Sequence, residues 1–105
     1  MIWKKGLLYR KSSIYDAIKN LEETALQIVL ITDIKKNFIG TLTDGDIRLG
    51  ILKGAKLNSS IEKLINKNPV AVNKSISKDD ALKIMKRHSI NHLPIVKNKK
   101  VVGLY

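Results

Sequence analysis

The chain contains one short stretch twice, first as Ser13-Ile14-Tyr15-Asp16-Ala17-Ile18 and then, 64 residues later, as Ser77-Lys78-Asp79-Asp80-Ala81-Leu82. Three further matches follow in the same order: Leu26-Gln27 with Ile90-Asn91, Ile31-Thr32-Asp33 with Ile95-Val96-Lys97, and Phe38-Ile39-Gly40-Thr41-Leu42 with Val101-Val102-Gly103-Leu104-Tyr105. The last match has an offset of 63, which places a deletion of one residue in a predicted turn. Because four matches occur in order with one small deletion, we expect a duplicated fold.

Each copy has the pattern of a strand, a helix and two further strands. Ser13 and Ser77 are predicted helix N-caps, because an aspartate stands three residues after each of them. Residues 28–31, which are apolar and mostly β-branched, predict a buried strand, and residues 38–42 predict its return strand. In the first copy a second helix is predicted from about residue 46 to residue 53, with Gly54 as the C-cap candidate. The expected fold class is therefore α/β (α+β), built from two β-α-β-β-α repeats.

The stretch between the two copies predicts a linker and a short helix. Residues 56–60 fit a linker, residues 61–65 fit a short helix, and Asn68-Pro69 closes it. We therefore expect repeat 1 at residues 1–55, the linker and short helix at 56–68, and repeat 2 at 69–105. By the repeat offset the counterpart of Thr43 would be residue 106. Repeat 2 is thus expected to lack its last helix, and the sequence to be the N-terminal part of a longer polypeptide.

Composition excludes several classes of protein. Hydrophobic residues make up 44% of the chain, as in folded domains. Cysteine is absent, which excludes disulfides and thiolate metal sites and fits a cytoplasmic location. No apolar run approaches the roughly 20 residues that span a bilayer, so we expect no membrane partner. His88 and His92 have a spacing that can bind metal on a helix, but no third ligand stands near them, so no metal site is predicted.

The formal net charge of +11 raises the alternative of nucleic-acid binding. The lysines are dispersed along the chain, however, and arginine, the better reader of bases and phosphates, occurs only at Arg10, Arg48 and Arg87. We therefore interpret most lysines as a solvated surface and keep nucleic acid as a less favoured partner.

The densest group of polar residues lies where a predicted strand gives way to a helix, between residues 40 and 48. Free N–H groups and the positive end of a helix favour an anion there. Thr43 could bond a phosphate or a sugar, Asp46 could accept both hydroxyls of a ribose, and Arg48 could neutralise a phosphate. Thr43 and Asp46 also fit a plain capping box, and Asp44 fits a local turn. Spacing alone leaves both interpretations open.

Three stretches together resemble the cystathionine-β-synthase-type domain, or CBS domain. They are Gly40-Thr41-Leu42-Thr43 followed by Asp46, Asn68-Pro69-Val70-Ala71-Val72, and His92-Leu93-Pro94-Ile95-Val96. The resemblance implies that two such domains pair through their sheets as a Bateman module, without a required cofactor. It also implies that Thr43 and Asp46, with Asp44 and Arg48 beside them, hold the ribose and phosphate of AMP, ATP or a related nucleotide. The base pocket would be lined by Leu26, Gln27 and Ile28 and by Gly6-Leu7-Leu8.

A narrower likeness concerns the residues around this motif. Asp44 to Arg48, Gly50 to Gly54 and Ile65 to Pro69 are similar to CBS pairs that precede sugar-phosphate nucleotidyltransferases. This likeness implies a regulatory module with a C-terminal catalytic domain attached and a homodimeric assembly. The chain has no Ser-His-Asp arrangement, buried carboxylate pair or Walker-type loop, so we predict no catalytic residues of its own. A ligand-free dimerisation module is the main alternative.

Overall fold

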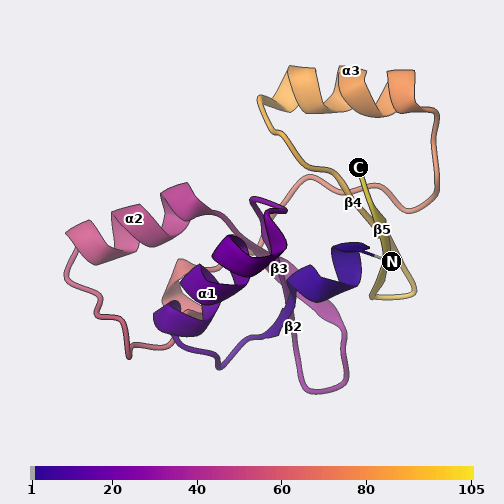
Figure 1. The fold of residues 1–105 in the computed structure, drawn as a ribbon. Coiled ribbons are helices and arrows are strands. Elements are labelled where there is room, and N and C mark those ends of the chain that lie inside the picture. Colours follow the sequence, from indigo (N-terminus) through magenta and orange to yellow (C-terminus); the bar gives the residue numbers. More distant parts are fainter. Residues whose placement is uncertain (1) are drawn as a thin grey trace. The chain divides into compact units, whose positions relative to one another are not determined.

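The computed structural model describes residues 2–105, which divide into two units between Asn68 and Pro69 (Figure 1). Each unit is described by itself. The elements of the first unit are, in chain order, the 3-10 helix η1 (Ile2–Gly6), β1 (Leu7–Tyr9), α1 (Ile14–Thr24), β2 (Val29–Thr32), β3 (Phe38–Leu42), α2 (Asp44–Leu52) and the 3-10 helix η2 (Glu62–Leu64).

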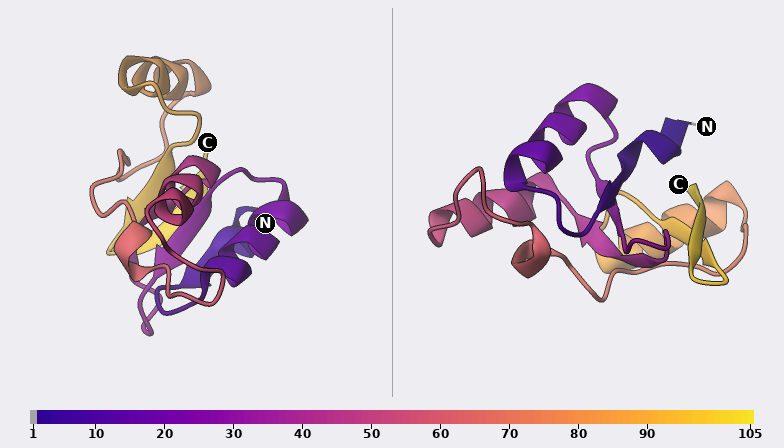
Figure 2. Two further views of the ribbon diagram at one scale, coloured as in Figure 1. Left: turned by 90° about the vertical axis from the view of Figure 1, so that its left-hand side faces the viewer. Right: turned by 90° about the horizontal axis from the view of Figure 1, so that it is seen from below.

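The first unit is built on a three-stranded sheet in the order β1-β2-β3. Strand β1 runs parallel to β2, with α1 between them in the chain, and β3 returns antiparallel to β2. Helix α1 contacts both β2 and α2 (Figure 2). The core of this unit consists of Ile14, Ala17, Val29, Ile31, Leu42, Ile47, Ile61 and Ile65. All four residues of β2 are buried, as the apolar run in the sequence predicts.

The predicted helix starts are confirmed. The Oγ of Ser13 accepts the N–H of Asp16 at 3.1 Å, and the Asp16 carboxylate accepts the N–H of Ser13 at 3.2 Å. In the second unit the Oγ of Ser77 accepts the N–H of Asp80 at 3.0 Å. Helix α2 begins at Asp44, two residues before the predicted start, because Thr43 caps it. It ends in Lys53 as the C-cap, so Gly54, at φ +107°, lies one position beyond the place predicted for it.

Residues 56–68, predicted as a linker with a short helix, complete the first unit. Ser60 forms an antiparallel bridge with Ser13, and the side chain of Ile61 is fully buried. At the outer edge of β3, the N–H of Thr41 donates to the Asn66 carbonyl at 3.1 Å, and the N–H of Asn66 donates back at 2.9 Å. Segment and sheet are therefore joined by main-chain hydrogen bonds, and the division into units falls after Asn68.

Up to its last strand, the second unit follows the order of elements of the first, and β4 and β5 have the same lengths as β2 and β3. Val72 provides a single bridge in place of a first strand, α3 (Lys78–His88) follows, and β4 (Pro94–Lys97) pairs antiparallel with β5 (Lys100–Leu104). The N–H of Ile76 donates to the Tyr105 hydroxyl at 2.7 Å, and that hydroxyl donates in turn to the Ile76 carbonyl. The tyrosine thus ties the last residue of the chain to the loop that leads into α3.

The two units also share their backbone register. Leu8 pairs with Ile31 in parallel in the first unit, and 64 residues later Val72 pairs with Ile95 in parallel in the second. Both sheets carry a register irregularity at the same place, immediately after Ile31 and immediately after Ile95. The repeat found in the sequence is therefore a repeat of strand pairing, and the mixed α/β fold class is confirmed.

Candidate functional site

The sheet register brings the predicted site residues of the first unit to one end of the sheet. Val29, the first residue of β2, pairs with Leu42, the last residue of β3, so Ile28 and Thr43 lie at the same end of the sheet. The start of β1 lies at that end as well. A Cβ built on Gly6 would approach Cδ1 of Leu26 to 3.1 Å and the carbonyl oxygen of Ile28 to 3.4 Å. The loop before β2, the start of β1 and the start of α2 therefore surround one end of the sheet.

Thr43 and Asp46 are joined in a closed capping box. Oδ2 of Asp46 accepts the N–H of Thr43 at 2.9 Å and its hydroxyl at 3.0 Å, and the Thr43 Oγ accepts the N–H of Asp46 at 3.3 Å. Both side chains are half-buried. Within residues 2–105 the second carboxylate oxygen, Oδ1, accepts no hydrogen bond, so it can accept one from outside. The structural and the ligand-binding interpretations of this pair are thus compatible.

Asp44 and Arg48 lie on the outer side of α2. They form an ion pair one helical turn apart, and both side chains are well exposed. Exposed pairs of this kind contribute about 0.5 kcal/mol or less, so the arginine can leave its partner at little cost. Arg48 would have to do so before it could neutralise a bound phosphate.

Gln27 and Ile28 differ in what they can offer a ligand. Gln27 is exposed and has a left-handed backbone, with φ at +65°, which is uncommon for a residue other than glycine. Its backbone directly precedes Ile28 at the sheet end described above. Ile28 is only 4% exposed, so its side chain packs in the interior and its main chain is the part that borders the site.

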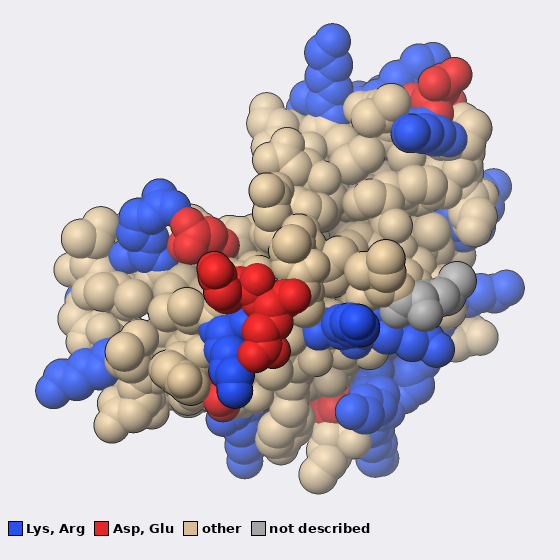
Figure 3. All heavy atoms as spheres, in the orientation of Figure 1, with Lys and Arg blue, Asp and Glu red and all other residues tan. Residues whose placement is uncertain are grey.

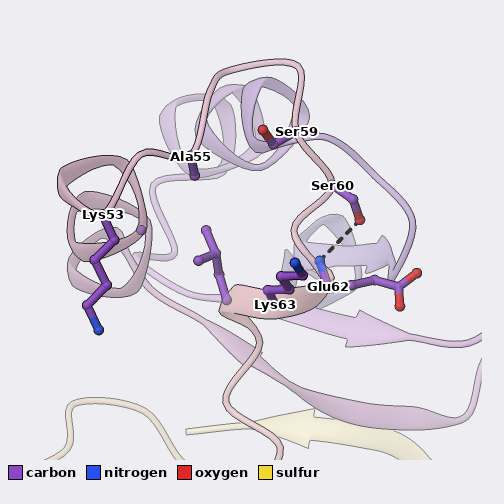
Figure 4. A pocket seen from close by; sticks show the side chains of 8 residues that line it. Lys53, Ala55, Ser59, Ser60, Glu62 and Lys63 are labelled. Carbon is purple, nitrogen blue, oxygen red and sulfur yellow. Dashed lines mark hydrogen bonds between the residues drawn. The ribbon is translucent and has the colours of Figure 1, made fainter.

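A hollow of about 770 Å³ lies elsewhere in the first unit, and none of the predicted site residues lines it. It is formed by Gly50, Lys53, Ala55, Ser59, Ser60, Glu62, Lys63 and Leu64 (Figure 4). Sequence reasoning missed this hollow, because its walls come from the end of α2 and from a segment that folds back on it. No local pattern of residues announces such a meeting.

The charged surface and the possible metal ligands can be described from the same structure. Lys and Arg side chains stand dispersed over the face shown in Figure 3, rather than in one continuous patch. Among the described residues no three His, Cys, Asp or Glu side chains gather as metal ligands. In the same part of the chain, no helix is long and apolar enough to cross a membrane.

The two-unit register and the strand-to-helix junction at Thr43 define the class of protein as a mixed α/β fold of the CBS type. The superposable structures include a CBS domain protein from Pyrobaculum aerophilum complexed with AMP. It aligns with a TM-score of 0.82 at 20% identity, over 94% of this chain and 77% of that one. Residues 61–105 match the model of the CBS domain family. Residues 61–105 therefore match a CBS domain, as the sequence resemblance predicts.

Curated relatives support the same conclusion. An uncharacterized protein of Rickettsia prowazekii is 32% identical over 93% of this chain and 30% of its own length. The CBS domain-containing protein CBSCBSPB1 of Arabidopsis thaliana is 31% identical over 89% of this chain and 18% of its own length. The chain thus spans less than a third of either relative. Neither carries the name of a nucleotidyltransferase.

Proposed function

We propose that this chain is a regulatory module that senses an adenosine nucleotide, AMP or ATP, at the Thr43–Asp46 end of its first sheet. The observation that carries the proposal is the convergence of three separate segments on that end. The Gln27 loop, the start of β1 and the capped start of α2 meet there through the pairing of Leu42 with Val29. The AMP found in the related Pyrobaculum aerophilum structure supports the choice of ligand.

The chemistry of the junction suits a nucleoside phosphate. The start of α2 offers N–H groups and the positive end of the helix dipole to the phosphate. Oδ1 of Asp46 can accept a ribose hydroxyl while Oδ2 keeps its bonds to Thr43. Arg48 can turn from Asp44 to the phosphate, because their exposed pair is weak. The exposed amide of Gln27 can both donate to and accept from the edge of a base.

Regulation would follow from a difference in affinity. A nucleotide shifts a two-state equilibrium only when it binds one state better than the other. The shared register of the two units supports a tandem CBS pair, in which such states are alternative arrangements of the repeats. The receiver would be an attached C-terminal catalytic domain. The likeness of residues 44–54 and 65–69 to their counterparts in such proteins favours a sugar-phosphate nucleotidyltransferase in the cytoplasm.

Calorimetry with two matched variants tests the nucleotide site. Asp46→Ala removes a capping box and the proposed ribose acceptor, whereas Asp16→Ala removes the equivalent capping box of α1 and nothing else. We expect Asp46→Ala to weaken AMP or ATP binding by roughly tenfold to a hundredfold, from the loss of a charge-assisted hydrogen bond. Asp16→Ala should leave binding unchanged. Equal effects of both variants, or no binding of AMP, ATP, GTP or CTP by the parent chain, would remove the proposal.

A ligand-free homodimerisation module is the second candidate, and one observation favours it. Helix α2 exposes apolar side chains on its outer side, with Leu49 at 53%, Ile51 at 42% and Leu52 at 79%. A helix that is apolar on several sides normally has a partner on each of them. Sedimentation at about 100 µM should then show a dimer, which Leu49→Ser with Leu52→Ser should convert to monomer. A monomeric parent chain contradicts this candidate.

A further inference from the structure

We propose that the hollow at the C-terminal end of α2 binds a small phosphomonoester, at a site separate from the proposed nucleotide site. The hollow lies between three parts of the first unit: Gly50 of α2 with the C-cap Lys53, the turn at Ala55, and the segment from Ser59 to Leu64 (Figure 4). Asp46 and Lys53 are seven positions apart, so the two sites are separated by about 10 Å along the helix axis. Binding at one site leaves the other open.

The walls of the hollow are held in place without a ligand. The N–H of Ala55 donates to the Gly50 carbonyl at 3.0 Å, and the N–H of Ile61 donates to the Ser12 carbonyl at 3.0 Å. Helix α2 can lie directly on Leu64 because Gly50 has no side chain. A Cβ at that position would come within 2.5 Å of Cδ2 of Leu64. The hollow is therefore preformed, and its volume of about 770 Å³ falls in the range of small-molecule sites.

The polar groups around the hollow are mainly hydrogen-bond donors. The Oγ of Ser59 accepts the N–H of Lys56 at 3.0 Å, and the Oγ of Ser60 accepts the N–H of Glu62 at 3.2 Å. With its oxygen engaged in this way, each serine keeps a hydroxyl proton that it can donate. The helix carbonyls nearby are less available, because Gly50 and Ile51 already accept N–H groups from the turn that follows α2.

The side-chain charge around the hollow favours an anion and opposes the negative C-terminal end of the α2 dipole. Within residues 2–105 neither Lys53 nor Lys63 has an ion-pair partner within 4.0 Å. The one carboxylate, that of Glu62, pairs with Arg10 at 3.5 Å and points away from the centre of the group in Figure 4. In Figure 4 the Lys63 ammonium lies toward the middle of the group, whereas the Lys53 side chain extends away from it and would have to turn inward to reach a ligand. With Lys53 turned inward, two ammonium groups and two hydroxyls suit the three terminal oxygens of a phosphate better than the two of a carboxylate. Ala55 and Leu64 add apolar contact for the organic part of an ester.

The test uses glucose 6-phosphate as the probe, with glucose and succinate as controls for the sugar and for charge. Binding is followed by calorimetry in about 150 mM salt, where diffuse attraction is screened, and by the backbone NMR signals of Gly50 and Lys63. Lys53→Gln with Lys63→Gln should weaken binding tenfold or more. Lys83→Gln with Lys86→Gln makes the same change in charge on α3 and should leave binding within twofold of the parent chain. Ala55→Phe should block the hollow with the lysines retained.

Three results would overturn the proposal. The first is an equal loss in both lysine pairs, which would assign the binding to overall charge. The second is succinate binding as tightly as glucose 6-phosphate, and the third is the absence of NMR shifts at Gly50 and Lys63 up to about 10 mM probe. Asp46→Ala should leave glucose 6-phosphate binding unchanged, so this proposal and the nucleotide site can fail independently.

Discussion

Replacing Gly40 by alanine should destabilise the first unit by about 3 kcal/mol. A Cβ at Gly40 would lie 2.6 Å from Cγ2 of Ile65 and closer still to the carbonyl oxygen of Asn66. Neither neighbour can yield easily, because Asn66 is held by two main-chain hydrogen bonds to Thr41 and Ile65 is part of the core. The methyl group can enter only if the segment at 65–66 moves away from β3.

The magnitude follows from what that movement disrupts. Normal carbon–carbon contact requires a displacement of roughly 1 Å. Such a shift breaks or stretches two hydrogen bonds that contribute about 1 kcal/mol each. It also uncovers part of Ile65, whose full burial contributes about 1.5–3 kcal/mol. A loss of about 3 kcal/mol would lower the midpoint of thermal unfolding by more than about 10 °C in a domain of this size.

The assay is urea unfolding followed by the fluorescence of Trp3, the chain's single tryptophan, which lies in the first unit. Gly45→Ala is the matched control, because the nearest atom to its Cβ would be the Thr43 Oγ at 3.8 Å. This control should be neutral or slightly stabilising, since alanine favours a helix over glycine. If Gly40→Ala costs no more than Gly45→Ala, the close approach of Asn66 to β3 is wrong.

Two further predictions concern the second unit. Tyr105→Phe should destabilise the second unit by about 1–2 kcal/mol, because the N–H and the carbonyl of Ile76 both lose their hydroxyl partner. Hydrogen exchange at the Ile76 amide should accelerate, and an unchanged exchange rate would contradict this contact. Lys99→Gly should stabilise the β4–β5 hairpin by about 1 kcal/mol, because Lys99 has φ at +67°, a strained conformation for any residue with a Cβ. Lys97→Gly, in the adjacent strand, should have the opposite effect on the unfolding midpoint, and a gain there would refute the turn geometry.

Local features of the fold could be predicted from the sequence because they depend on residues a few positions apart. A serine followed three residues later by an aspartate predicts a capped helix, and Ser13 with Asp16 forms that cap. The apolar run before Asp33 predicts the buried strand β2 in the same way. The repeat offset of 64 relates residues that are far apart in the chain. It aligns the pairing of Leu8 with Ile31 in the first unit with the pairing of Val72 with Ile95 in the second.

The candidate site was predicted only in part. The sequence could place Thr43 and Asp46 at the start of a helix, and the family resemblance added Gln27 and Ile28. That these segments share one end of a sheet depends on the register of β2 with β3. Residue spacing also leaves open which carboxylate oxygen of Asp46 accepts the hydrogen bonds of Thr43. Side-chain geometry decides that it is Oδ2.

The packing of residues 56–68 and the hollow beside them were decided by tertiary structure. The sequence predicts a linker at 56–60 and a short helix at 61–65, where η2 lies, but it does not show that Ile61 is buried or that Asn66 completes the edge of β3. The partner of Asn66 is Thr41, and the contact is possible because Gly40 has no side chain. The sequence by itself determined the helices, the strands and their repetition, because each arises from neighbouring residues. The tertiary structure decided which distant segments meet, because close packing depends on the shapes of surfaces that form only when the chain has folded.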